Sequence, residues 1–442
     1  MMRKLLFKTN NIARSSYFWN ATAGGLNALQ SVVILMVINR VLDETASGVF
    51  SIAWSISYLV YTLARFGMRN YQVTDANNLF TINEYFSSRF ITTALMLMAG
   101  IAYTMYGRYF LHYTLYKCTV VLLICVWKVI DSFEDVLHAW YQKEGRLDVA
   151  GKAMSVRYLV GLIALLTSLI LTKNLIYSIL SCIVFSFIVF YFCTIKIISE
   201  FGQIIIKAPN KNVIRLLRFC LPLCIGEFLS IYIGNAPKLA IDTYLTEEMQ
   251  AIFNFIFMPV FAIGLLASFI YNPIVASLGE AWEKRQFTTV KQTIRQQSII
   301  IICITIVVVI AGQIAGVQVL GILYSTDLTT YKTELCILLI GGGMMALSGL
   351  FVVILVTLRK QNKLILGYGI SSTVALALST YCVRNNGLMG AAVSYLLTTC
   401  TLVVVLVVVV VKTMKAISIE NCINNEDKVE SKTSNEERNA HR

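Results

Sequence analysis

The chain alternates between long apolar stretches and short polar gaps. An apolar helix needs roughly 20 residues to cross about 30 Å of hydrocarbon, and twelve stretches reach this length. The pattern therefore predicts an all-α, polytopic membrane protein with about twelve transmembrane helices. The stretches cover residues 17–40, 46–67, 86–107, 117–141, 153–172, 175–198, 215–241, 248–275, 296–317, 334–357, 364–382 and 388–412.

Identical residues recur about 203 positions apart along the chain, which indicates an internal repeat. Parallel repeats are typical of transporters whose two lobes rock about a central cavity. We therefore predict an N-terminal lobe at 1–198 and a C-terminal lobe at 215–415, each with six helices, around such a cavity. A cytoplasmic link at 199–214 joins them, and a polar tail at 416–442 is expected to be disordered. The matched pairs are Leu42 and Leu245, Glu44 and Glu247, Phe50 and Phe253, Leu63 and Leu266, Ala64 and Ala267, and Phe66 and Phe269.

Positive charge is concentrated in alternate gaps. Of the 37 Lys and Arg residues, only seven lie in the intervening gaps, and Lys128 lies inside a stretch. The positive-inside rule makes the crowded gaps cytoplasmic, so both termini are expected in the cytoplasm. The net charge of +13 is spread over these short loops, which favours contact with anionic membrane lipid and not with nucleic acid. The seven exceptions are Arg40, Arg108, Lys117, Lys173, Lys238, Lys332 and Arg384.

Motifs for covalent or metal chemistry are missing from the sequence. The 11 cysteines lie mainly in apolar stretches without CxxC spacing, and the three histidines form no ligand pattern. There is no GxxxxGK[ST] phosphate loop. We therefore expect no cofactor, no metal and no enzymatic activity.

Polar residues inside apolar stretches are the candidate functional residues, because a charge in lipid is costly unless it faces protein or water. The first stretch carries Asn20, Asn27 and, beside their face, Gln30. Their helical spacing places Asn20 and Asn27 on one face, which either packs against another helix or lines a cavity.

The fourth stretch carries the densest cluster of charge. Lys128, Asp131, Asp135 and His138 follow one helical face, with Glu134 one residue away. Lys128 and Asp131 are spaced to form a pair. The cluster either staples helices together or forms a water-filled cavity wall, where a carboxylate would bind a coupling proton or sodium ion.

The seventh stretch carries Glu227, Asn235, Lys238 and Asp242. Glu227 is expected near the middle of the membrane, about 16 Å along the axis from Lys238 and too far for a pair. Lys238 either reaches the outer headgroups or meets an anionic group inside a cavity.

The run Asn235-Ala-Pro-Lys238-Leu-Ala-Ile-Asp242, followed by Leu245-Thr-Glu247 and Phe253-x-Phe-x-Phe-x-Pro259, resembles the middle of bacterial polysaccharide flippases. These translocases of O-antigen or capsular repeat units belong to the multidrug/oligosaccharidyl-lipid/polysaccharide exporter superfamily. The resemblance implies a multi-pass protein of the bacterial cytoplasmic membrane that moves a polyprenyl-diphosphate-linked oligosaccharide from the inner to the outer leaflet by alternating access. It also implies a polysaccharide polymerase and glycosyltransferases as pathway partners.

On this hypothesis the candidate residues divide by chemistry. The diphosphate would meet Lys128, Lys238 and Arg40, or Arg65 and Arg69 at the cytoplasmic mouth, and polar side chains such as Asn20, Asn27, Gln30 and Trp54 would bind sugar hydroxyls. A cation-coupled drug or small-molecule antiporter of the same superfamily is the nearest alternative. A membrane-embedded polysaccharide polymerase or ligase is a further alternative, which the short outer gaps disfavour.

Overall fold

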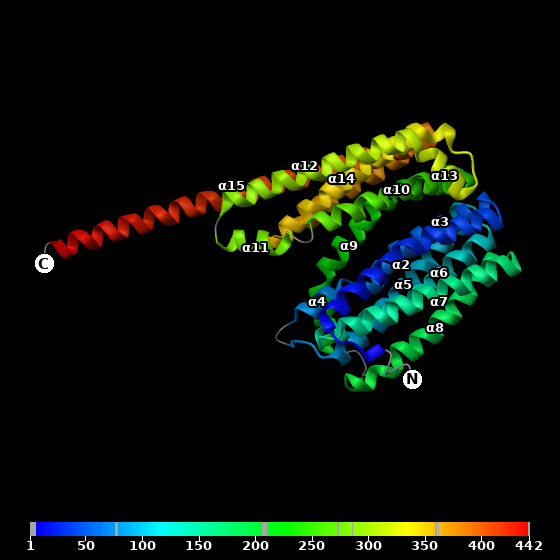
Figure 1. Cartoon of the computed structure of the whole chain (residues 1–442), viewed down its shortest axis with the longest axis horizontal. Helices are drawn as coiled ribbons and strands as arrows, with labels where there is room; N and C mark the ends of the chain where they lie inside the picture. The colour runs from blue at the N-terminus through cyan, green and yellow to red at the C-terminus, as the bar shows by residue number, and fades with distance from the viewer. Residues whose placement is uncertain are drawn as a thin grey trace.

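The computed structural model describes residues 6–75, 78–205, 210–271, 274–284, 286–358, 360 and 362–440. Within these ranges the chain is helical almost throughout, and the helices form two lobes (Figure 1). The first lobe contains α2 (Ile12–Val41), α3 (Glu44–Arg65), α4 (Met68–Thr74), α5 (Ile82–Phe110), α6 (Leu115–Lys143), α7 (Leu147–Thr172), α8 (Leu175–Cys193) and the 3-10 turn η1 (Ile195–Glu200). The second lobe contains α9 (Lys211–Tyr244), α10 (Glu247–Tyr271), α11 (Val275–Glu283), α12 (Phe287–Ala311), η2 (Gly312–Gly316), α13 (Val317–Tyr324), η3 (Thr329–Tyr331), α14 (Lys332–Thr357) and α15 (Asn362–Ala440).

The predicted membrane spans are confirmed as helices. Ten helical segments of the described residues are long and apolar enough to cross a membrane. The segment Asn362–Met414 is long enough for two crossings and changes direction at Gly387, where the backbone leaves the helical region. The helix α6 matches the predicted stretch 117–141 but carries too many charges to qualify by apolarity. With α6 included and α15 counted as two crossings, the protein is a multi-pass membrane protein with the twelve helices that the sequence predicts.

Several helices begin at a residue whose side chain caps the first turn. The side chains of Asn11, Asp43, Thr114 and Asn210 each accept a hydrogen bond from a backbone N–H of the helix that follows. Thr81 does the same for α5 and forms a capping box with the third helical residue. Because the first N–H groups of a helix have no internal partner, these caps fix where the helices start.

The interval between the predicted repeats recurs in the helices. The ends of α2 and α9 lie 203 residues apart, as do the starts of α3 and α10, taking the difference of their printed residue numbers. Thr45 Oγ donates a hydrogen bond to the carboxylate of Glu248, its own counterpart at a separation of 203 residues, over 2.6 Å. The first turns of α3 and α10 therefore meet at positions that the predicted repeat makes equivalent.

The lobes meet at one end of the molecule and diverge toward the other. They lie together near the start of α3 and α13 and separate toward α4 and α11 (Figure 1). At the joined end the backbones of α3 and α10 come so close that a Cβ on Gly48 would overlap the carbonyl oxygen of Glu247. This close approach requires glycine at that position.

The long helix α9 connects the lobes. Its first half packs on the first lobe, where Phe219 stacks on Tyr71 and Cys224 Sγ lies 3.8 Å from the carbonyl oxygen of Thr62. The same helix also packs against α15 and α10 of the second lobe. The C-terminal lobe predicted at 215–415 therefore sends part of its first helix across to the other lobe.

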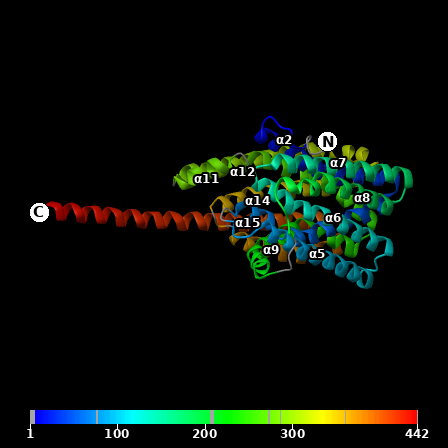
Figure 2. The same cartoon turned by 90° about the horizontal axis from the view of Figure 1, so that it is seen from below.

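The predicted link and tail differ from the structure in extent. Of the link at 199–214, residues 206–209 lie outside the described residues, and α9 already begins at Lys211. The tail predicted to be disordered from 416 continues α15 to Ala440, and this helix projects away from both lobes in two perpendicular views (Figures 1 and 2). The sequence from 416 to 440 contains neither glycine nor proline, so no strong helix breaker interrupts α15 there.

Candidate functional site

An ionic cluster closes the joined end of the lobes, which we call the clamped end. Lys117 of α6 donates to Asp242 of α9 over 2.5 Å and to Glu247 of α10 over 2.8 Å. The phenol of Tyr113 also donates to Asp242. Burial, and next the Asp242 carboxylate, raises the pKa of Tyr113, so the phenol stays protonated as a donor. This cluster joins α6 of one lobe to both α9 and α10 of the other.

Hydrogen bonds between α2 and α13 extend the clamped end. The side-chain amide of Asn39 donates to the carbonyl oxygen of Tyr324 over 2.6 Å and to Thr326 Oγ over 2.9 Å. Arg40 donates to the carbonyl oxygen of Ile322 over 2.9 Å. These contacts tie the end of α2 to α13, so several independent contacts hold the lobes together here.

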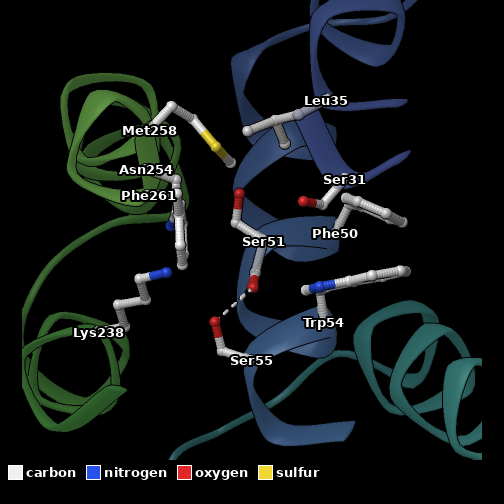
Figure 3. Close-up of a pocket in the computed structure, with 10 residues that line it drawn as sticks. All are labelled: Ser31, Leu35, Phe50, Ser51, Trp54, Ser55, Lys238, Asn254, Met258 and Phe261. Carbon is white, nitrogen blue, oxygen red and sulfur yellow. Dashed lines mark hydrogen bonds between the residues drawn. The ribbon is translucent and has the colours of Figure 1, made fainter. Parts of the chain in front are cut away.

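A small cavity of about 40 Å³ lies between the lobes beyond the clamped end. The helices α2 and α3 form one wall, and α9 and α10 form the other (Figure 3). Its polar lining residues come from both lobes, while aromatic and aliphatic side chains fill the remainder. The lining consists of Ser31, Leu35, Phe50, Ser51, Trp54, Ser55, Lys238, Asn254, Met258 and Phe261.

Lys238 is the cation of this cavity. Its side chain is buried, with 5% of the residue exposed, and it points from α9 toward α3 (Figure 3). The ammonium lies 4.6 Å from the centre of the Phe257 ring and 5.7 Å from that of Phe261. No described carboxylate lies within ion-pair distance of Lys238. The Lys238 ammonium is therefore held by aromatic faces and is not neutralised by a described acidic residue.

Lys128 lies behind the cavity wall that α2 and α3 form. Its ammonium lies 4.5 Å from the centre of the Trp54 ring and donates to Asp131 over 2.8 Å. Trp54 lines the cavity and packs edge-on against Trp127. The predicted pair of Lys128 and Asp131 is thus present, and the Trp54 indole separates it from the cavity.

The acidic residues of α6 are neutralised by arginines from neighbouring helices. Arg157 of α7 is 1% exposed and lies 2.6 Å from both Asp131 and Glu134. Arg89 of α5 is fully buried and donates to Asp135 over 2.8 Å. Such pairing removes the cost of a lone buried charge.

Arg69 of α4 is the outermost member of this group. One of its guanidinium nitrogens lies 3.5 Å from Asp135 and another donates to Gln142 over 3.2 Å. The group therefore joins four helices of the first lobe, namely α4, α5, α6 and α7.

Arg65 and Glu227 form an ion pair of 2.5 Å between the lobes, near the diverging end. Arg65 is the last residue of α3, after which Phe66 and Gly67 both adopt the left-handed conformation. A Cβ at Gly67 would crowd Leu223 of α9, so the break in α3 fits closely against α9. The rings of Tyr58 and Tyr61 face the guanidinium at 5.7 and 5.0 Å.

The predicted residues of α2 differ in their surroundings. Asn20 donates to the carbonyl oxygen of Leu147 over 3.0 Å and thereby fastens α2 to α7. Asn27 is half-buried, and Gln30 is buried with a side-chain nitrogen that has no partner among the described residues. The cavity reaches α2 at Ser31 and Leu35 instead.

Four of the predicted site residues are not part of the cavity lining. Asp242 and Arg40 lie in the clamped end, because Lys117 and the carbonyl oxygen of Ile322 engage them there. Glu227, in the middle of α9, pairs with Arg65 at the end of α3. Asn235 uses its amide to bond the carbonyl oxygen of Ile231 in its own helix.

The sequence analysis missed Arg89, Arg157 and Lys117 as members of buried ion pairs. The positive-inside count assigned them to loops, although Arg89 and Arg157 both fall within predicted helices. The signal available was the excess of acidic residues on α6, which required cationic partners from adjacent helices.

Comparison with known proteins agrees with this architecture. No family model matches the chain. The chain is 23% identical over 386 residues to the capsular polysaccharide biosynthesis protein CapF of Staphylococcus aureus, covering 84% of this chain and 92% of that protein.

Two solved structures share the fold. An inward-facing multidrug resistance MATE family transporter of the MOP superfamily aligns with a TM-score of 0.70 at 12% identity, over 88% of this chain and 95% of the other. The lipid II flippase MurJ, in an inward closed conformation, also aligns with a TM-score of 0.70 at 12% identity, over 93% and 90%. The predicted resemblance is thereby confirmed at the level of the fold, and this chain shares the two-lobed fold of these two transporters.

Proposed function

We propose that this protein flips a polyprenyl-diphosphate-linked oligosaccharide from the inner to the outer leaflet of the bacterial cytoplasmic membrane, for assembly of a surface polysaccharide. Both termini would lie in the cytoplasm. The clamped end then faces outward, and the lobes diverge toward the cytoplasm, where such a substrate is made. In alternating access, the clamped end would separate after the substrate has entered between the lobes.

Lys238 is the observation that carries this proposal. It is a buried cation, it faces a cavity between the lobes, and no described acidic residue neutralises it. A diphosphate group supplies the missing negative charge, and the serines and Trp54 of the same cavity suit hydroxyl groups and sugar faces. The present cavity is far smaller than an oligosaccharide, so entry of the sugar would require the lobes to move apart.

The acidic residues argue for an anionic cargo over a cationic drug. Asp131, Glu134, Asp135, Glu227 and Asp242 are each paired with Lys or Arg. A lipophilic cation would need one of these carboxylates to be released first. We therefore propose that the site chiefly binds the anionic substrate, and that coupling of transport to a proton or sodium ion is secondary.

The test is transport by the purified protein in vesicles that contain a fluorescent polyprenyl-diphosphate oligosaccharide. Substrate reaching the opposite leaflet is detected by a membrane-impermeant glycosidase. We expect the wild type to move the lipid, Lys238→Ala to lose at least tenfold in rate, and Lys238→Arg to recover part of it because the charge is kept.

Lys284→Ala is the matched control, since Lys284 is an exposed lysine of the second lobe whose ammonium pairs with Glu280 of the same lobe. It should flip at the wild-type rate. Undiminished flipping by a well-folded Lys238→Ala protein would contradict the proposal. Efflux of cationic dye without flipping would support the antiporter instead.

A further inference from the structure

The ammonium of Lys238 has an unusual environment for a buried cation. Phe257 and Phe261 face it with their rings, and the nearest wall of the other lobe presents serine side chains. Aromatic faces attract a cation, but they do not cancel its charge. An isolated buried charge is strongly disfavoured, so a negative charge bound in the cavity would stabilise the ammonium form of Lys238.

Ser51 provides a second, independent indication. Its hydroxyl is buried, lines the same cavity and has no hydrogen-bond partner among the described residues. The neighbouring hydroxyl of Ser55 is already used, because it donates to the carbonyl oxygen of Ser51 over 3.0 Å (Figure 3). Buried hydroxyl groups are rarely left unpaired, so Ser51 has a donor available for a molecule inside the cavity.

The size of the cavity limits what this molecule can be. One water molecule requires about 10–15 Å³ on this measure of volume, so a cavity of about 40 Å³ has room for a few water-sized groups. A single-atom anion fits and accepts hydrogen bonds from an ammonium and a hydroxyl together.

We propose that a halide ion, chloride under cellular conditions, binds in this cavity between Lys238 of the second lobe and Ser51 of the first. The anion neutralises Lys238 while the lobes are closed around it. Because its ligands come from α9 and α3, it also links the lobes across the cavity. In the transport cycle, a step that rests on the proposed function, the substrate diphosphate would take the place of this ion.

The experiment measures thermal unfolding of the full-length protein in detergent while chloride replaces gluconate at constant ionic strength. Gluconate, with its hydroxylated carbon chain, is a far larger anion than chloride. We expect the midpoint to rise by about 2 °C when chloride exceeds its dissociation constant tenfold, following the usual linkage between binding and stability. Bromide should act like chloride, and its anomalous scattering in crystals should place one ion beside Lys238.

Variants separate this site from general effects of salt. Lys238→Met should abolish the response to chloride, Ser51→Ala should weaken apparent chloride affinity several-fold, and Lys284→Met should respond like the wild type. If Lys238→Met does not fold, the comparison between Ser51→Ala and the wild type still decides the question.

A midpoint that responds equally to chloride and gluconate, or a cavity that shows only water in bromide crystals, would overturn the halide site. Neither measurement uses the glycolipid. The halide site can therefore fail while flipping is observed, and flipping can fail while the halide site stands.

Discussion

Arg65 and Glu227 join the two lobes through an ion pair of 2.5 Å at a distance from the clamped end. Among the described ion pairs between lobes, the others belong to Lys117 at the clamped end. The pair fastens the first half of α9 to the end of α3. Both side chains remain about one quarter exposed, so the contact is open to competition from water or an anionic group.

We expect this contact to act as a latch whose charges can be exchanged. Arg65→Glu and Glu227→Arg should each slow transport because like charges then face each other, and the double exchange should restore most of the rate. For a partly exposed pair the coupling energy should be about 0.5–1 kcal/mol, or roughly two- to fivefold in rate. A double-mutant cycle on initial flipping rates measures it.

The exposed pair of Lys284 and Glu280 is the control for that cycle. Glu280 lies in α11 and Lys284 directly follows this helix, so the pair lies within one lobe. Exchanging those charges should leave transport unchanged. Additive effects of the Arg65 and Glu227 exchanges, with no recovery in the double variant, would exclude a latch.

The buried pairs of Arg157 should matter for stability more than for rate. Arg157→Met leaves Asp131 and Glu134 without their guanidinium, and we expect the free energy of unfolding to fall by about 3–5 kcal/mol. Adding Glu134→Gln to this variant should recover a large part of the loss, because it removes one uncompensated charge. Chemical unfolding in detergent measures both, and a loss below about 1 kcal/mol would contradict the inferred network.

The clamped end should open when the backbones of α3 and α10 are forced apart. Gly48→Ala places a Cβ against the carbonyl oxygen of Glu247, and we expect faster labelling of a cysteine at Thr246 by an impermeant thiol reagent. Gly24→Ala in α2 is the control, because its Cβ meets nothing within 4 Å. Equal labelling in both variants would show that the crossing of α3 and α10 tolerates the added carbon.

The membrane orientation is tested by two single cysteines in a background without native cysteines. A cysteine at Thr246, in the connection before α10, should react with impermeant reagent from outside intact cells. A cysteine at Lys143, the last residue of α6, should react only after the cells are opened. Labelling of Lys143 from outside would reverse the orientation and, with it, the direction of transport proposed above.

The helices could be predicted from the sequence because lipid imposes a fixed length of apolar helix. The spacing of Lys128 and Asp131 by three residues also sufficed to predict their contact, since both lie on one turn of α6. Contacts between distant segments could not be predicted in this way. Nothing local to Asp242 shows that Lys117 reaches it, or that Arg65 of the first lobe meets Glu227 of the second.

The repeat interval could be read from a few identical residues, but it did not reveal how the lobes differ. Buried ion pairs cluster on α6 of the first lobe, whereas the second lobe contributes Lys238 with aromatic neighbours. Pattern matching detects what two repeats share. The chemistry of this site lies in what they do not share.

The charges of α6 have a consequence for how the protein is made. Alone in a bilayer, a helix with Lys128, Asp131, Glu134 and Asp135 would be unfavourable to insert, since each charge at the centre costs about 2.5–3.5 kcal/mol. Its partner Arg89 is synthesised earlier, on α5, but Arg157 emerges only with α7. We therefore expect α6 to remain at the translocon until α7 arrives, so that the three helices leave for the lipid together. Ribosome-bound chains truncated before Arg157 should show α6 still accessible to water.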